Sequence, residues 1–442
     1  MADADNPQSE QKFQTLRGFM DVLPEDHEYF TLIKKAVRHR ARQAGLRRIS
    51  TPYLEETGVF VRGLGESTDV VSKELFTLES RSGKLMSLKP EGTAGAVRAY
   101  IEHGMHTLPQ PVQFYYIEPH FRYDRPQKGR FRQFHQYGFE IIGERDPSID
   151  AQVIHIAWKI LKDMGIDKRF DLQINTLGTP TARGEYISAL KNYFYGKERH
   201  LCSDCQNRLE SNPLRLLDCK EEDCQILSSL APKMQEYLDQ ESTDFYESLK
   251  AYLVELEVPF YENPRLVRGL DYYTDTVFEF WDRSQGAQNA IGGGGRYDGL
   301  VEKLGGTHTP AFGCAFGMER VMMHLKEAGI TPPPKDRIHV FVAQLGEEAK
   351  KKAMRLVSDL REEGIHTMGA MGKSSMKAQL KMADKFGVDW TVILGEVEVR
   401  NGTAIIRDME HGRQEIVPMN TIIPEIIKLV GAEKRDRYEL GE

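Results

Sequence analysis

The chain has 442 residues, of which 40% are hydrophobic and 28% are charged, and its formal net charge is −7 at pH 7. This composition is typical of a globular protein with sizeable buried cores, and the length predicts about two to four domains. No apolar run approaches the roughly 18 residues that a membrane span needs, so no membrane partner is expected. The acidic balance gives no general nucleic-acid signature, and any such binding must come from local patches.

The first residues, MADADNPQSEQKFQ, lack the apolar and Arg-rich patterns of a targeting peptide. Five cysteines in a chain without a secretion signal favour reduced thiols and a cytoplasmic location.

Residues 1–177 alternate helical stretches with runs that resemble strands, and we expect them to form the first part of one domain. The spacing of Phe30, Ile33, Val37 and Ala41 predicts an amphipathic helix over 28–45, with Gly45 as its stop. In SLKPEGTAG (87–95), Pro90 and Gly92 flank Glu91. This setting either presents a carboxylate to a ligand or forms an ordinary turn.

Residues 112–123 and 131–142 are predicted to pair as antiparallel strands, because Pro126 to Gly129 mark a loop between them. Alternation places Gln136, Gly138 and Glu140 on one face of the second strand, together with Arg132, Phe134 and Ile142. That face is either exposed to solvent or lines a pocket, and its apolar members favour the pocket. Residues 120–132, which include this loop, carry five cations and one acid, which indicates either a polyphosphate site or a solvated charge run.

Residues 178–262 are predicted to form a helical insertion, within which two pairs of cysteines occur. Cys202, Cys205, Cys219 and Cys224 either hold a structural zinc ion or are reduced structural cysteines, and Cys314 is expected to be a small buried residue.

Strand signals return at 261–281, and residues 263–330 are predicted to complete the first domain. Arg268 lies in an apolar stretch read as strand, where it needs a partner or a bound anion. The glycines of NAIGGGGRYDGL (289–300) permit close approach to a flat ligand or bend a strand, and GCAFGMERV (313–321) predicts a strand that runs into a helix. Residues 331–336 contain three prolines and are predicted to form a linker. The pattern of 337–430 alternates β, α, α, β and predicts an α/β module. Residues 431–442 are predicted to form a charged tail.

Several of these motifs resemble those of one enzyme family. FRYDRPQKGRFRQFHQ is similar to motif 2 of class II aminoacyl-tRNA synthetases, and GCAFGMER is similar to motif 3. KPEGT, RGLDYYT and GGGGRYDGL resemble signatures of the histidyl-tRNA synthetases, and the resemblance extends from Arg17 to about residue 430. It implies an α+β fold, with an antiparallel-sheet catalytic core, a helical insertion and a C-terminal α/β anticodon-binding domain.

The resemblance also implies a reaction: ATP-dependent ligation of L-histidine to tRNA(His) through a histidyl-adenylate, with Mg²⁺ accompanying ATP. The implied catalytic residues are Arg122 and Arg268. The implied histidine-binding residues are Glu91, Gly92, Thr93, Arg122, Gln136, Glu140, Arg268, Tyr272, Tyr273 and Tyr297. The implied ATP-binding residues are Arg122, Asp124, Arg130, Gly295 and Arg320, and Asp124 stands where the family often has glutamate.

The expected tRNA contacts are Gln127 and Lys128 in the loop, and Lys373, Lys377 and Lys381 in the C-terminal module. Pro52 matches a motif 1 proline associated with a homodimer interface, so a homodimer is expected. Two alternative hypotheses are a histidine-binding regulatory subunit of ATP phosphoribosyltransferase and a synthetase-like tRNA sensor. The three arginines 122, 268 and 320 and the C-terminal module argue against the first, and the lack of further domains argues against the second.

Overall fold

The computed structural model describes residues 13–66, 68–284, 286–332, 337–370, 372 and 375–436, with the backbone alone over 286–289. The chain divides into two compact units, Met1–Pro332 and Pro333–Glu442. Most of the predicted linker and the end of the predicted tail lie outside the described residues. Within the described part, no helix combines the length and apolar character needed to cross a membrane.

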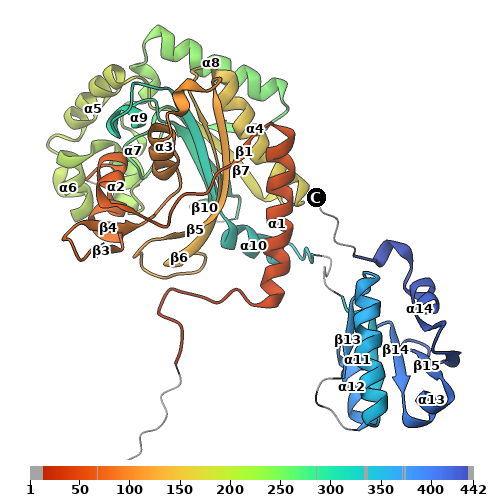
Figure 1. Cartoon of the computed structure of the whole chain (residues 1–442). Helices are drawn as coiled ribbons and strands as arrows, with labels where there is room; N and C mark the ends of the chain where they lie inside the picture. The colour runs from red at the N-terminus through yellow and green to blue at the C-terminus, as the bar shows by residue number, and fades with distance from the viewer. Residues whose placement is uncertain are drawn as a thin grey trace, which may run out of the picture. The chain divides into compact units, whose positions relative to one another are not determined.

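An eight-stranded sheet forms the centre of the first unit (Figure 1), in the order β1-β5-β6-β11-β10-β9-β7-β8. It is antiparallel except at its two edge pairs, β1–β5 and β7–β8. The strands are β1 (Arg47–Arg48), β5 (Val112–Phe121), β6 (Gln133–Ile142), β7 (Phe170–Thr176), β8 (Phe260–Glu262), β9 (Thr274–Asp282), β10 (Gly286–Arg296) and β11 (Ala311–Gly317).

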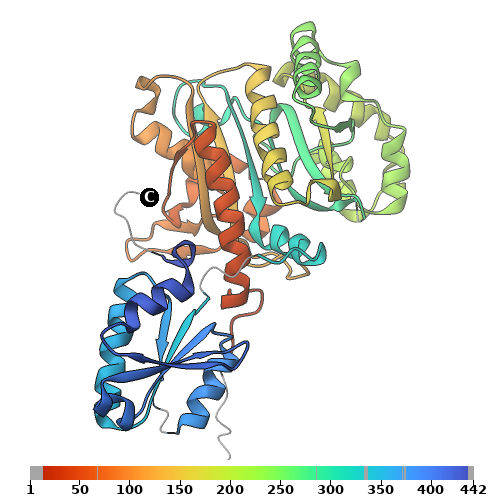
Figure 2. The same ribbon diagram turned by 90° about the vertical axis from the view of Figure 1, so that its right-hand side faces the viewer.

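A layer of helices covers one face of this sheet. It contains α1 (Pro24–Gln43), α4 (Pro147–Asp163), α8 (Gln240–Glu255) and α10 (Met318–Glu327). Figure 2 shows α1 and α4 running alongside the strands, with the green helices of the insertion gathered toward one end. The predicted first helix is confirmed, and Phe30, Ile33, Val37 and Ala41 are its buried residues.

The opposite face of the sheet packs against a second group of elements. These are the helices α2 (Thr57–Leu64), α3 (Thr93–Glu102), α5 (Pro180–Phe194), α6 (Ser203–Ser211), α7 (Glu222–Ser229) and α9 (Leu300–Lys303). A small sheet, β2-β4-β3, accompanies them and is built from Leu54–Glu56, Leu85–Leu88 and Thr77–Glu79. The face between these elements and the large sheet carries the polar groups described below.

The predicted hairpin is confirmed, since β5 and β6 pair from Val112 opposite Ile142 to Phe121 opposite Gln133. The predicted alternation along β6 also holds. Tyr137, Phe139 and Ile141 enter the core beneath α1 and α4, whereas Gln136 and Glu140 lie on the other face.

The prediction of a strand through Arg268 is wrong. Residues 263–273 form a loop between β8 and β9, and the turn at its start is closed by the Leu266 N–H donating to the Asn263 carbonyl at 2.9 Å. Pro264, which has no N–H to give to a ladder, explains why the strand ends there in spite of its apolar neighbours.

The second unit has a five-stranded sheet in the order β13-β12-β14-β15-β16. Its strands are β12 (Val340–Gln344), β13 (Thr367–Gly369), β14 (Trp390–Leu394), β15 (Thr403–Asp408) and β16 (Gln414–Pro418). On one face lie α11 (Glu347–Glu362), α13 (Glu396–Asn401) and α14 (Ile422–Val430), and on the other lies α12 (Met376–Lys385). The β, α, α, β order predicted from sequence corresponds to β12, α11, α12 and β14, and the remaining elements were not predicted. The α+β class with a C-terminal α/β unit is confirmed.

Candidate active site

Glu140 of β6 lies at the centre of a buried group of hydroxyls. The carboxylate is inaccessible to solvent and accepts hydrogen bonds from Thr93 Oγ1 at 2.7 Å, from the Tyr116 hydroxyl at 3.3 Å and from the Tyr297 hydroxyl. Burial raises the pKa of Glu140 to about 8, because a low-polarity environment disfavours the charged form. This carboxyl therefore binds a proton more readily than a carboxyl in water does.

The start of α3 brings Glu91 and Thr93 beside this group. Glu91 is buried and accepts the backbone N–H of Thr93 at 2.7 Å and that of Ala94 at 2.8 Å. Burial raises its pKa above the ordinary value. Gly92 is required for close approach, since a Cβ there would lie 2.3 Å from the Tyr116 ring. The KPEGT motif thus serves as both a helix start and a wall of the site.

Arg268 and the two tyrosines that follow it form a second cluster in the 263–273 loop. The Tyr272 and Tyr273 hydroxyls are 3.4 Å apart, and the Arg268 guanidinium lies 5.5 Å from the centre of the Tyr273 ring. Arg268 forms an ion pair with Glu279 of β9, which also accepts from Trp281 Nε1 at 2.7 Å. The Arg268 Nε is buried and has no hydrogen-bond partner among the described residues.

The glycine run of β10 makes room for these side chains. A Cβ on Gly293 would lie 3.0 Å from Arg268 Nη1, and a Cβ on Gly295 would lie 2.9 Å from Tyr273 Cδ1. In neighbouring β11, a Cβ on Gly313 would meet Glu140 Oε2 at 1.8 Å. The run is a strand with register shifts rather than a simple bend. Because the glycines have no side chains, Arg268 and Tyr273 lie directly on the sheet.

Three arginines come together near the end of the β5–β6 hairpin. Arg122 Nε donates to the Pro90 carbonyl at 2.9 Å, and Arg320 Nε donates to the Gly129 carbonyl at 3.1 Å. Arg130 pairs with Asp124 at 3.3 Å. Burial, together with the charges of Arg130 and Arg122, lowers the pKa of Arg320 to about 10. Because these cations repel one another, the binding of an anion among them is favourable.

The expected tRNA contacts are spread over both units. Gln127 and Lys128 are exposed at the tip of the hairpin loop, where Lys128 Nζ lies 3.0 Å from Glu327 Oε1. Lys377 and Lys381 are exposed one turn apart on α12, which begins at Met376 with the Ser375 hydroxyl as its cap. Lys373 lies outside the described residues.

Two polar groups on the Glu140 face of the β5–β6 hairpin are buried and lack hydrogen-bond partners among the described residues. One is the Gln136 carbonyl oxygen, and the other is the ring of His120, which lies between Tyr116 and Phe134. Burial and the charges of Lys89 and Arg122 lower the pKa of His120 well below its ordinary value. An unpaired buried acceptor costs about 1–3 kcal/mol, so Gln136 is well placed to accept from a ligand.

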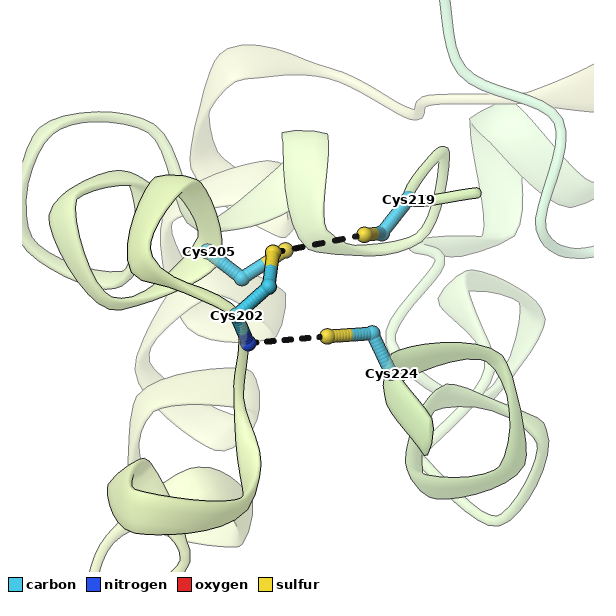
Figure 3. Close-up of side chains that lie close together, drawn as sticks. All are labelled: Cys202, Cys205, Cys219 and Cys224. Carbon is cyan, nitrogen blue, oxygen red and sulfur yellow. Dashed lines mark hydrogen bonds between the residues drawn. The ribbon is translucent and has the colours of Figure 1, made fainter. Parts of the chain in front are cut away.

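The cysteines of the insertion also come together (Figure 3). Cys205, Cys219 and Cys224 are buried and Cys202 is half-buried, and their four sulfurs lie within 4.8 Å of one another. A cavity of about 320 Å³ lies between this insertion and the 263–273 loop. It is lined by Arg268 and Tyr273 on one side and by Asn212 and Arg215 on the other.

Three residues of the site were missed in the sequence: Tyr116, His120 and Glu279. Tyr116 and His120 lie on the face of β5 that meets the Glu140 face of β6, so the hairpin register could have indicated them. Glu279 is a lone acid in the apolar strand TVFEFW (276–281), which is a sign of a buried partner. No local pattern named Arg268 as that partner.

Comparison with known proteins gives consistent results. The family model for histidyl-tRNA synthetase matches residues 18–321, and the model for the anticodon binding domain matches 339–429. A histidine–tRNA ligase of Dehalococcoides mccartyi is 49% identical over 418 residues, which cover 95% of this chain and 100% of the relative. The crystal structure of apo Staphylococcus aureus histidyl-tRNA synthetase aligns with a TM-score of 0.79 at 34% identity, covering 94% of this chain and 100% of that one.

A Bacillus halodurans structure described as an ATP phosphoribosyltransferase regulatory subunit/histidyl-tRNA synthetase aligns with a TM-score of 0.61 at 20% identity. The match covers 88% of this chain and 99% of that one. At this identity the likeness indicates a shared fold alone.

Proposed function

Because this chain belongs to the histidyl-tRNA synthetase family, we propose that it joins L-histidine to tRNA(His) in an ATP-dependent reaction. In the first step the histidine carboxylate attacks the α-phosphate of ATP, a histidyl-adenylate forms and pyrophosphate leaves. In the second step the histidyl group passes to the terminal ribose of the tRNA, and AMP is released. The observation that carries the proposal is the buried Glu140 group beside a cluster of arginines.

The histidine side chain is proposed to lie against Glu140, which shares a proton with one imidazole nitrogen. Tyr272 or Tyr273 would place a hydroxyl near the other nitrogen, because both hydroxyls are buried in the same cluster. Gln136, whose oxygen has no partner among the described residues, and Glu91 would accept from the histidine ammonium group. A site of buried polar groups rejects a substrate that leaves them unpaired by roughly 10⁴–10⁵-fold.

The phosphates of ATP, which enters with Mg²⁺ as substrate, are proposed to meet the arginines. Arg122 and Arg268 would contact the α-phosphate, and Arg320 the γ-phosphate, with Asp124, Arg130 and Gly295 completing the site. The proposed chemistry requires no protein nucleophile. The rate enhancement would come from positioning the two substrates and from stabilising the negative charge that develops on the phosphate. The insertion cysteines supply none of the groups that this chemistry uses.

The tRNA is proposed to contact both units, at Gln127 and Lys128 of the hairpin loop and at Lys377 and Lys381 of α12. A cytoplasmic location is proposed, because all five cysteines are free thiols and reduced thiols are typical of that compartment. Changing Lys377 and Lys381 to glutamate is expected to raise the KM for tRNA and to leave pyrophosphate exchange unchanged, because phosphate contacts act on binding. Steady-state aminoacylation measures this, and an unchanged KM would remove the two lysines from the tRNA site.

A homodimer is proposed through the small β2-β4-β3 sheet and the Pro52 segment before it. This region exposes Tyr53, Leu54 and Leu78 at 51%, 42% and 48% of their surface. Grouped exposed apolar side chains are typical of an interaction surface. Analytical ultracentrifugation should give the mass of two chains, and a single-chain mass at micromolar concentration would contradict the proposal.

Exchange of labelled pyrophosphate into ATP tests the first step. Exchange should require histidine and should not occur with the other amino acids, and charging of tRNA(His) transcript tests the second step. If folded protein binds histidine without exchange, the regulatory-subunit reading takes the place of this proposal.

The pH dependence of histidine binding tests the role of Glu140. Free histidine loses its side-chain proton near pH 6.5, and the Glu140 carboxyl loses its proton near pH 8. Between these values the complex forms with one shared proton and no net proton exchange. Below this window binding must release a proton, and above it binding must take one up. Affinity should therefore be greatest between the two pKa values and fall up to about tenfold per pH unit outside them.

Isothermal titration calorimetry measures this profile, with Glu140→Gln as the matched variant. The amino group of histidine titrates on the alkaline side as well, so the readout is the difference between the two proteins. The variant should bind more weakly at neutral pH and lose the part of the alkaline fall that Glu140 causes. Parallel profiles would show that Glu140 does not share a proton with the ligand.

A further inference from the structure

Four cysteines from three separate segments converge in the insertion. Cys202 precedes α6 and Cys205 lies in its first turn, Cys219 follows the short helix Pro213–Leu216, and Cys224 lies in the first turn of α7. Their side chains point toward a common space (Figure 3), and all four are free of disulfides. The Cys202 and Cys219 sulfurs are 3.8 Å apart. Two sulfurs on a tetrahedral zinc ion, each about 2.3 Å from the metal, are also separated by about 3.8 Å.

The alternative is that the cysteines are four small apolar residues of a core. That reading accounts for their burial, and Leu201, Leu209 and Leu216 are buried in the same cluster. It does not account for the clustering of all four sulfurs within 4.8 Å of one another. The backbone N–H of Cys202 also donates to Cys224 Sγ at 3.2 Å. Such a donor is typical of the groups that orient and stabilise metal-bound ligands.

The ligand set decides which metal fits. Four sulfur donors exclude Mg²⁺ and Ca²⁺, which take oxygen ligands, and favour zinc. A set of four protein ligands leaves no open position for substrate, so the ion would be structural rather than catalytic. The four thiols would release their protons to solvent as the metal binds, which leaves a Zn(Cys)₄ centre with a net charge of −2.

The centre would fix the chain between Cys205 and Cys219, which reaches the proposed active site. Asn212 Nδ2 donates to Asp271 Oδ1 at 2.8 Å, within the loop that carries Arg268 and Tyr273. Arg215 pairs with Asp69 at 3.0 Å. Asn212 and Arg215 line the cavity of about 320 Å³ whose other side is Arg268 and Tyr273. A zinc ion that ordered this segment would therefore also fix the position of the loop that carries Arg268.

We propose that Cys202, Cys205, Cys219 and Cys224 bind one Zn²⁺ as thiolates, and that this ion positions the 206–218 segment against the loop that carries Arg268. The metal site stands on the geometry of the cysteines alone. Its effect on catalysis rests on the proposed function, because the loop matters only if Arg268 acts on substrate.

Metal analysis of the purified full-length chain tests the site. About one equivalent of zinc per chain is expected, and it should be absent from Cys219→Ser and Cys224→Ser. Cys314→Ser is the matched control, because Cys314 is also buried but lies in β11, and this variant should retain its zinc. Less than about a tenth of an equivalent in the wild-type chain, or iron in place of zinc, would overturn the proposal.

A second measurement does not depend on whether the variants fold. Wild-type chain refolded with Co²⁺ should show the sulfur-to-metal charge-transfer absorption of a tetrahedral thiolate site, and Zn²⁺ should displace it. A spectrum of octahedral Co²⁺ would contradict four sulfur ligands.

The positioning role is tested with Asn212→Ala, which keeps all four cysteines. This variant should retain one zinc and exchange pyrophosphate up to about 100-fold more slowly, as expected when a reacting group is displaced. Wild-type rates with zinc retained would overturn the positioning role and leave the metal site standing. Failure of the wild-type chain to exchange pyrophosphate would instead count against the proposed function.

Discussion

Replacing Arg268 with alanine is expected to slow histidine-dependent pyrophosphate exchange by about 100- to 1,000-fold, the usual effect of losing one preorganised charge-stabilising donor. The guanidinium lies over Gly293 with a buried Nε that has no partner among the described residues. A phosphate oxygen would complete its hydrogen bonding. The fold should survive, because Arg268 belongs to a loop and Glu279 keeps its bond from Trp281 Nε1 at 2.7 Å.

Two further variants separate charge from geometry. Arg268→Lys keeps the charge and loses the planar fork, so an intermediate rate is expected. Arg265→Ala is the matched control, since Arg265 is an exposed residue of the same loop, and it should exchange at the wild-type rate. A higher KM for histidine with an unchanged kcat in Arg268→Ala would assign Arg268 to uniform substrate binding and contradict transition-state stabilisation.

Local patterns were sufficient to predict the hairpin and its polar face. The loop at Pro126–Gly129 fixed where the strands turn, and a period of two then placed Gln136 and Glu140 together. The same approach failed at 263–273, where apolar residues without a ladder partner form a loop. Burial there comes from contact with the sheet and the insertion, and a hydrophobic window does not distinguish that burial from strand pairing.

The candidate site was predicted unevenly for a similar reason. Residues such as Glu91, Glu140 and Arg268 were indicated by short motifs, but their partners come from distant segments. Glu279 meets Arg268 because the 263–273 loop lies on the sheet at Gly293, the residue of β10 that pairs with Glu279. Sequence spacing does not record how a loop packs onto a sheet, so this pair could not be predicted from it.

Arg296, at the end of β10, is fully buried, and its replacement with methionine should destabilise the first unit strongly. Its guanidinium pairs with Asp150, with Asp298 at 3.1 Å, and with the carbonyls of Glu144 and Asp146 at 3.4 Å. The free energy of unfolding should fall by about 3–5 kcal/mol, because the buried Asp150 carboxylate loses its ion-pair partner, whereas Asp298 keeps Arg145 at 3.5 Å. Urea unfolding followed by tryptophan fluorescence measures the loss.

The control is Arg283→Met, which removes a half-exposed ion pair to Asp171 at 2.7 Å and should cost less than about 1 kcal/mol.

The loss in Arg296→Met should depend on pH. Burial already raises the pKa of Asp150 to about 6, and removal of the guanidinium raises it further. A carboxyl that binds a proton more tightly in the folded chain favours folding as pH falls. The deficit should therefore shrink as pH falls toward about 6 and stay constant below that value, and it should partly disappear in Arg296→Met/Asp150→Asn. A deficit that is independent of pH would mean that lost packing, rather than the unpaired carboxylate, destabilises the variant.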